Sequence, residues 1–178
     1  MENFDALSST LDSLFSQIDV ENITADSNTR FANLPDGYYL CEVAKAELRE
    51  TKTNKPMYTF QFKVFEDGHK HVVSDGNAEF ETIPNTKNRV IFKNYVISKK
   101  EDLEGFISDM LKFEIDGEQM LEKSYFTSTS GTLDALDVII GSTIYVMLQT
   151  YTNRKGEEQQ NTNIVKWSVA NELGLPTE

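Results

Sequence analysis

A chain of 178 residues has the usual length of one domain with an appendage, so a second full-sized domain is not needed. Hydrophobic residues make up 39% and charged residues 26%, a balance that supports a packed interior and excludes wholesale disorder. No run approaches the roughly 20 apolar residues that cross a bilayer, and the first residues lack the basic start of a secretory signal. We therefore expect a cytosolic protein, with the single Cys41 as a small core residue.

The net charge of -12 disfavours a protein that binds any polyanion loosely, because phosphate contacts need Lys and Arg. The charge is unevenly distributed, however. Residues 1–44 hold one basic side chain against eight acidic ones, residues 45–100 hold eleven against seven, and residues 101–178 hold five against fourteen. A relatively basic middle segment therefore lies between two acidic ends, so the overall acidity does not exclude nucleic-acid binding.

The first segment has a helical pattern. Between residues 4 and 20, large apolar side chains recur at spacings of three and four, which predicts an amphipathic helix. They are Phe4, Leu7, Leu11, Leu14, Phe15 and Ile18. Residues 21–30 are polar and have no period, as in a linker. We therefore divide the chain into an acidic helical arm with its linker (1–30), one domain (31–170) and a short C-terminal tail (171–178).

The apolar stripe of this helix needs cover, because six large apolar groups left exposed would promote aggregation. The domain itself, a second subunit of a homo-oligomer or a groove in a partner protein would each provide it. The sequence leaves these alternatives open and favours cover by the domain or by a second subunit over a partner's groove.

The domain has strand patterns in five segments, which are residues 38–49, 57–65, 89–97, 143–151 and 161–169. The second alternates most clearly, with Tyr58, Phe60 and Phe62 on its apolar face. Helical patterns at 102–113 and 133–140 stand between the third and fourth strands, and residues 74–88 are rich in turn formers. Five strands are too few for two full sheets. We therefore expect a mainly β fold with inserted helices, namely a five-stranded Greek-key barrel of the OB-fold kind plus the N-terminal amphipathic helix.

Catalytic chemistry has little support in the sequence. The only histidines, His69 and His71, stand two apart with no Cys or carboxylate cluster nearby, which is weak evidence for a metal site. No Gly-rich phosphate loop, nucleophile elbow or Cys pair is present. We expect a protein that is not an enzyme, with no catalytic residues, no metal and no cofactor.

Binding of single-stranded nucleic acid has more support, because it needs cations that follow the phosphates and flat rings on which bases stack. The candidate residues of both kinds fall in three groups. Around the first two strands they are all basic, namely Lys45, Arg49, Lys52, Lys55 and Lys63. On or beside the third strand they are Arg89, Lys93 and Tyr95. In and after the last hairpin they are Tyr151, Arg154, Lys155, Lys166 and Trp167.

Each candidate has a structural alternative. Outer lysines on strands are often solvated edges, and Trp167 is equally suited to anchor a core. Tyr95 and Tyr151 are favoured as stacking residues because their neighbours are polar or basic. Lys93 and Tyr95 stand two apart in a strand, so we expect them to share an outward face opposite Phe92 and Val96.

Several segments resemble single-stranded DNA-binding proteins from bacteriophage replication and recombination modules. Residues 34–43 and 47–57 resemble the opening hairpin of that family, and residues 90–96 its third strand. Residues 139–146 and the stretch from Asn163 to Trp167 are similar to its C-terminal half, so the resemblance spans Leu34 to Trp167.

The resemblance implies an OB-fold, sequence-tolerant binding of single-stranded DNA without a cofactor, and location in the cytoplasm of the bacterial host. The partners it implies are a phage recombinase, nuclease or helicase. Better-known bacterial binders end in an acidic tail with a terminal aromatic, whereas residues 171–178 are short and weakly acidic. The acidic N-terminal arm is therefore the better candidate for recruiting partners.

A second hypothesis belongs to another class. The net charge of -12 suits an acidic phage accessory protein whose small β-barrel binds a host or phage enzyme, as an interaction module or a mimic of nucleic acid. The basic middle segment and the resemblance favour DNA binding over this alternative.

Overall fold

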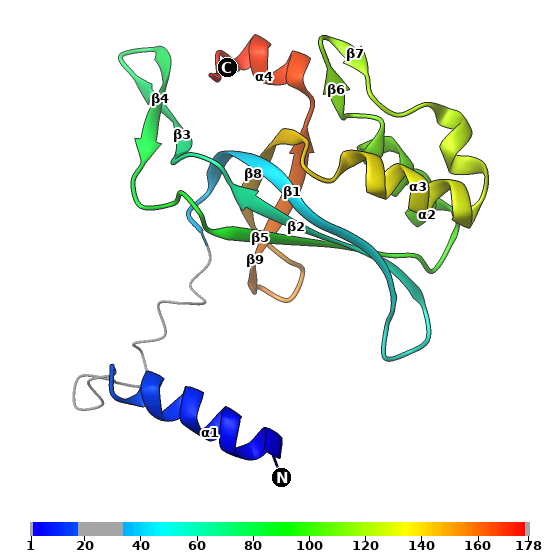
Figure 1. Cartoon of the computed structure of the whole chain (residues 1–178). Helices are drawn as coiled ribbons and strands as arrows, with labels where there is room; N and C mark the ends of the chain where they lie inside the picture. The colour runs from blue at the N-terminus through cyan, green and yellow to red at the C-terminus, as the bar shows by residue number, and fades with distance from the viewer. Residues whose placement is uncertain (1, 18–33, 177–178) are drawn as a thin grey trace. The chain divides into compact units, whose positions relative to one another are not determined.

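The computed structural model describes residues 2–17 and 34–176, which form two separate units (Figure 1). In the first unit, α1 spans Glu2–Phe15 and contains five of the six residues of the predicted stripe. The sixth, Ile18, and the predicted linker lie outside the described residues. Leu11, Leu14 and Phe15 are 51%, 49% and 62% exposed, so this part of the stripe is uncovered in the structure.

The second unit is built on one antiparallel sheet of seven strands. Its strands are β1 (Gly37–Glu50), β2 (Pro56–Val64), β3 (Gly68–Ser74), β4 (Asn77–Ile83), β5 (Val90–Val96), β8 (Thr143–Thr152) and β9 (Glu158–Val165). The order is β4-β3-β1-β2-β5, and β8 pairs with both β1 and β9. The mainly β, antiparallel character predicted from the sequence is confirmed, and the five predicted strands correspond to β1, β2, β5, β8 and β9.

The sheet does not close into a barrel in the part of the chain that the structure describes. β5 and β9 make no backbone pairing with each other. Two lysine side chains contact β9 instead, Lys93 from β5 and Lys112 from the inserted segment that follows β5. The Lys93 ammonium donates to the backbone carbonyl of Thr162, and the Lys112 ammonium donates to that of Ile164 at 3.3 Å. The two edge strands therefore lie near each other with side chains, not a hydrogen-bonded ladder, between them.

The β3–β4 hairpin is the main departure from the predicted strand pattern, since residues 74–88 were expected to be turns. β4 occupies much of that segment and pairs with β3 from Gly68↔Ile83 to Ser74↔Asn77. Asp75 and Gly76 form the turn, with φ of 52° and 79°. His69 and His71, the two histidines that the sequence analysis weighed as a metal site, lie in β3. The ring centres of His71 and Phe80 are 5.2 Å apart. No group of His, Cys, Asp or Glu that could hold a metal occurs among the described residues.

The core lies between the inner face of the sheet and the inserted helices, which Figure 1 shows on the side of the sheet away from the β3–β4 hairpin. The insert comprises α2 (Lys100–Met110), β6 (Glu114–Ile115), β7 (Glu118–Gln119), η3 (Lys123–Thr127) and α3 (Thr129–Ile139). Phe106 of α2 is fully buried, and its ring stacks on Tyr58 at 4.1 Å. Tyr58, Phe60 and Phe62 are at most 6% exposed, which confirms the predicted apolar face of the second strand. No described helix is long and apolar enough to cross a membrane.

The C-terminal segment differs from the sequence prediction. The last strand ends at Val165, and Trp167 begins a helix, α4 (Trp167–Leu173), which follows directly. Leu175 is only 4% exposed, and the hydroxyl of Tyr145 donates to the carbonyl of Pro176. Leu175 of the predicted tail therefore packs in an apolar cluster with Leu40, Tyr145 and Val165, whereas residues 171–174 and 176 are exposed.

Candidate functional site

The outer face of β1, β2 and β5, opposite the core, is the main uncovered surface of the sheet. Directly paired residues in antiparallel strands point to the same side. Across the three strands the outward rows are Glu42–Lys63–Val90, Lys45–Gln61–Phe92, Glu47–Thr59–Asn94 and Arg49–Met57–Val96. Phe92 is 63% exposed and Val96 42%, so β5 presents apolar side chains to solvent here. We call these twelve residues the outer face.

The basic residues predicted around the first hairpin are brought together on or beside the outer face. Lys45 and Arg49 both contact Glu47, at 3.3 Å and 2.8 Å, and the Arg49 hydrogen bond lowers the Glu47 pKa. These exposed ion pairs add little stability, so the two cations stay available to a ligand. Lys63 makes no ion pair with any described residue. Lys52 and Lys55 are exposed in the β1–β2 connection.

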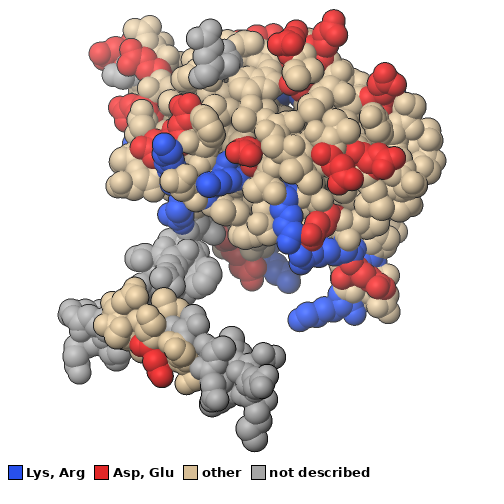
Figure 2. All heavy atoms as spheres, viewed as in Figure 1, with Lys and Arg blue, Asp and Glu red and all other residues tan. Residues whose placement is uncertain are grey.

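Many basic side chains of the second unit gather on one part of its surface. Figure 2 shows Lys and Arg gathered from the β1–β2 hairpin across the lower half of the body, whereas most of the acidic side chains lie above them. The basic middle segment of the sequence therefore becomes a basic surface, although the whole chain carries a charge of -12.

Lys93 and Tyr95 do share a face of β5, but it is the inner one, and the prediction that they point outward is wrong. The pairing of β2 with β5 places Tyr95 opposite Tyr58 and Lys93 opposite Phe60, and these partners point into the core. The Tyr95 ring packs edge-on against Phe106 at 5.2 Å. Tyr95 is therefore a core residue and not a free stacking platform.

A half-buried polar network replaces the expected outward pair. The Tyr95 hydroxyl donates to Asp109 Oδ2 at 2.5 Å, and Asp109 also pairs with Lys112 at 2.7 Å. Burial, together with the charge of Asp109, raises the pKa of Tyr95 far above its usual value. The Lys93 ammonium lies 4.9 Å from the Tyr95 ring centre, and burial lowers its pKa. This network bridges the open seam between β5 and β9.

The remaining predicted residues are spread over other parts of the domain. Tyr151 is 43% exposed on β8, and Arg154 and Lys155 are exposed in the β8–β9 turn. β8 is two strands away from β2 in the sheet, so these three residues form a second, separate group. Arg89 is half-buried just before β5.

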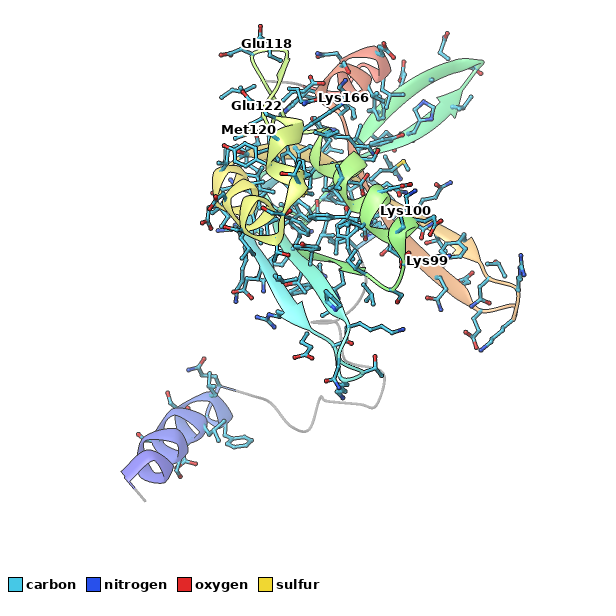
Figure 3. The ribbon with its side chains drawn as sticks, turned by 90° about the vertical axis from the view of Figure 1, so that its right-hand side faces the viewer. Lys99, Lys100, Glu118, Met120, Glu122 and Lys166 are labelled. Atoms are coloured by element: carbon cyan, nitrogen blue, oxygen red, sulfur yellow. The ribbon has the colours of Figure 1, made fainter. Side chains whose placement is uncertain are left out.

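Lys166 and Trp167 do not belong to the outer face. Lys166 pairs with Glu114 at 3.3 Å, and Figure 3 shows it between α4 and the β6–β7 hairpin that carries Glu118. The Trp167 indole donates to the carbonyl of Thr143 at 3.2 Å, and its ring packs 5.7 Å from Tyr145. The alternative reading of Trp167 as an anchor residue fits this geometry.

Two aromatic residues that the sequence reasoning did not select lie on this side of the sheet. Phe92 occupies the centre of the β5 row, and Phe65, 54% exposed, directly follows β2. Lys63 precedes Phe65 by two residues and therefore points to the same side. The sequence analysis placed Phe92 on the inner face of this strand, whereas the pairing of β5 with β2 places it on the outer face.

The loop before β5 is held rigidly next to Phe65. Thr86, 3% exposed, accepts a hydrogen bond from the Gly68 amide at 2.8 Å and donates to the carbonyl of Ile83 at 2.9 Å. Asp67 accepts from the backbone amides of Lys87 and Thr86, at 2.9 Å and 3.0 Å, and these bonds lower its pKa. These hydrogen bonds therefore fix the backbone of the loop at Lys87.

Comparison with known proteins does not add a family. No protein-family model matches the sequence, and no curated protein matches it either. The function must therefore be argued from the geometry of the outer face.

Proposed function

We propose that the chain binds single-stranded DNA on the outer face of β1, β2 and β5, without strong sequence preference, and protects it during phage replication or recombination. The observation that carries this proposal is the 63% exposed ring of Phe92 on a sheet face that also presents Lys45, Arg49 and Lys63. Bases stack on exposed rings of this kind while cations beside them contact the phosphates.

The exposed ring of Phe92 gives the outer face a physical reason to bind a flat ligand. A ring of this size gains free energy when it is covered, and Phe92 shares its sheet face with Val96 and Lys45, so a base that stacks on it would bury apolar surface beside a cation. Phe65 extends the apolar surface past the end of β2. About four residues of strand separate Phe65 from Gln61, the partner of Phe92, so the two rings lie roughly 13 Å apart along the strand direction.

The connectivity of the strands supports an OB-like arrangement. β1 pairs with β2 on one side and β8 on the other, β2 pairs with β5, and a helical segment precedes the β8–β9 hairpin. We infer from this order an OB-like, Greek-key arrangement with an added β3–β4 hairpin and an open seam. In OB-folds the face of the second and third strands and the two hairpin loops beside it bind oligonucleotides. Here that face would be formed by β2 and β5, with the loop of Lys52–Lys55 beside it, while Arg154 and Lys155 belong to the separate group at the β8–β9 turn.

A titration with a labelled oligo(dT), followed by fluorescence anisotropy, tests the proposal. Phe92→Ala should weaken binding by the equivalent of about 1–3 kcal/mol, the usual contribution of one stacked base. The matched control is Val73→Ala, because Val73 is 68% exposed on the β3–β4 hairpin, away from the outer face. Equal affinities of the two variants, or no binding by the wild-type protein, would refute the proposal.

A second proposal concerns the N-terminal arm, which would recruit a partner protein while the domain binds DNA, and one observation favours it. α1 is an acidic helix on which Leu11, Leu14 and Phe15 are exposed, which is the form of a helix that docks into an apolar groove. This function does not exclude DNA binding, since the arm and the domain are separate units. Capture of a recombinase, nuclease or helicase that is lost in Leu11→Asp/Phe15→Asp would support it.

A further inference from the structure

A hollow of about 370 Å³ lies at the end of the outer face, between the end of β2 and the loop before β5. Phe65 provides an exposed aromatic wall, and the charged lining residues are Lys63, Lys87, Glu42 and Glu66. The volume falls within the range of about 300–1,000 Å³ that is typical of small-molecule sites. Because Asp67 and Thr86 fix the loop on one side, the hollow exists before any ligand arrives.

The charges of the hollow argue against a phosphate as its occupant. Its two lysines and two glutamates carry opposite charges that cancel, and Glu42 stands directly opposite Lys63 across the strand pair. None of the four makes an ion pair within the described part of the chain, so all four side chains can face a ligand. A neutral, flat ligand with hydrogen-bonding edges fits such a site better than an anion does.

A nucleobase has these properties, and the carboxylates discriminate between bases. Glutamate accepts hydrogen bonds from an exocyclic amino group such as cytosine N4. Thymine has no amino group and carries O4 where cytosine carries N4, so a carboxylate placed to accept from N4 would face a carbonyl oxygen and be repelled by it. The aromatic wall accepts either ring by stacking, because every base has a π-face.

We propose that this hollow is a base-selective subsite in which Phe65 stacks on a base and Glu42 and Glu66 select one that carries an exocyclic amino group. The inference rests on the proposed binding of single-stranded DNA and adds a preference to it. A strand bound along the outer face would enter the hollow beyond Val90, which is paired with Lys63. One base of the bound segment is read there while the rest are held without selection.

Competition between oligo(dC) and oligo(dT) of equal length tests this subsite, because the two strands differ in base edges but match in charge and ring size. The wild-type protein should bind oligo(dC) at least about fivefold more tightly, the lower end of the discrimination from one good contact to a base edge. Glu42→Gln/Glu66→Gln should bring the ratio close to one, and because the change removes two negative charges, oligo(dT) should bind at least as tightly as it does to the wild-type protein. The control is Glu79→Gln, an exposed glutamate on β4, which should keep the wild-type ratio.

The possible failures are distinguishable. Equal binding of both oligonucleotides by the wild-type protein overturns the base-selective subsite and leaves the proposed function standing. A preference for oligo(dC) that survives in the double variant assigns the selection to another site and also overturns the inference. If neither strand binds, the proposed function fails, and the subsite fails with it. Thermal unfolding of each variant verifies that the fold is retained.

Discussion

The two faces of the β1–β2–β5 sheet use the same kinds of residue for different ends. On the inner face, the rings of Tyr58, Phe60 and Tyr95 pack around Phe106 and are covered by α2. On the outer side, Phe92 and Phe65 have no cover and share their surroundings with Lys63. An aromatic ring stabilises the fold where a helix covers it, and it is available to a ligand where charged side chains surround it and no element covers it. Variants on the two faces should therefore separate stability from binding.

The largest effect should come from removing the centre of the inner cluster. Phe106→Ala deletes a fully buried ring that contacts three other rings, and such truncations cost about 3–5 kcal/mol. Urea unfolding measures the loss. Oligonucleotide affinity per folded molecule should stay at the wild-type value, because no atom of the outer face changes. A cost below about 1 kcal/mol would mean that the inner stack is not the core that we describe.

Tyr95→Phe should have an intermediate effect on stability and none on binding. It keeps the ring but removes the hydroxyl that donates to Asp109, and a hydrogen bond to a charged group contributes roughly 1.5–3 kcal/mol. Urea unfolding and oligonucleotide titration measure the two effects. If this variant lost affinity for DNA while its unfolding curve stayed unchanged, Tyr95 would belong to the binding surface and the two faces would be wrongly assigned.

Lys63→Ala should leave stability nearly unchanged and alter the salt dependence of binding. Each lost phosphate contact reduces the slope of log K against log salt by about 0.7 for single strands. Titrations at several salt concentrations give this slope. Lys123→Ala is the control, since Lys123 is exposed in η3, away from the outer face. An identical slope in both variants would remove Lys63 from the phosphate contacts.

The fourth prediction concerns alkaline pH and one covered ring, that of Tyr39. Burial, followed by the charge of Asp36, raises the pKa of Tyr39 from 10.0 to about 12, and its hydroxyl donates to Pro35 at 2.5 Å. A raised folded-state pKa means that the contribution of Tyr39 is complete below pH 10 and is lost as the pH rises towards 12. The melting temperature should fall over this range, and less steeply in Tyr39→Phe. Equal slopes would show that Tyr39 titrates alike in both states.

The sequence predicted the buried face of a strand correctly where one side of the strand is apolar and the other is polar. In β2, Tyr58, Phe60 and Phe62 alternate with polar residues, and the structure buries all three. The β5 sequence Val-Ile-Phe-Lys-Asn-Tyr-Val has apolar residues on both faces, so its alternation cannot determine which face is inside. The pairing of Tyr95 with Tyr58 and the cover from Phe106 decide it, and both depend on residues far apart in the chain.

Two further features were missed for different reasons. The β3–β4 hairpin had a local signal, because Asp75-Gly76 is a favoured two-residue turn between strands, but the turn formers around it obscured the pattern. Trp167 could not be assigned to a helix from its neighbours, since a seven-residue helix has too few positions to show a period. The open seam at β5 and β9 follows from the geometry of the whole sheet and has no sequence signature.

Photochemical cross-linking tests the central claim most directly. The protein is irradiated in complex with a single-stranded oligonucleotide, and the modified residues are identified by mass spectrometry. Our account predicts that the adducts are on Phe92 and Phe65, the exposed rings of the outer side, and not on the buried rings of Tyr58 and Tyr95. Adducts confined to Tyr151 or Trp167 would contradict the account and move the binding surface to β8 and α4.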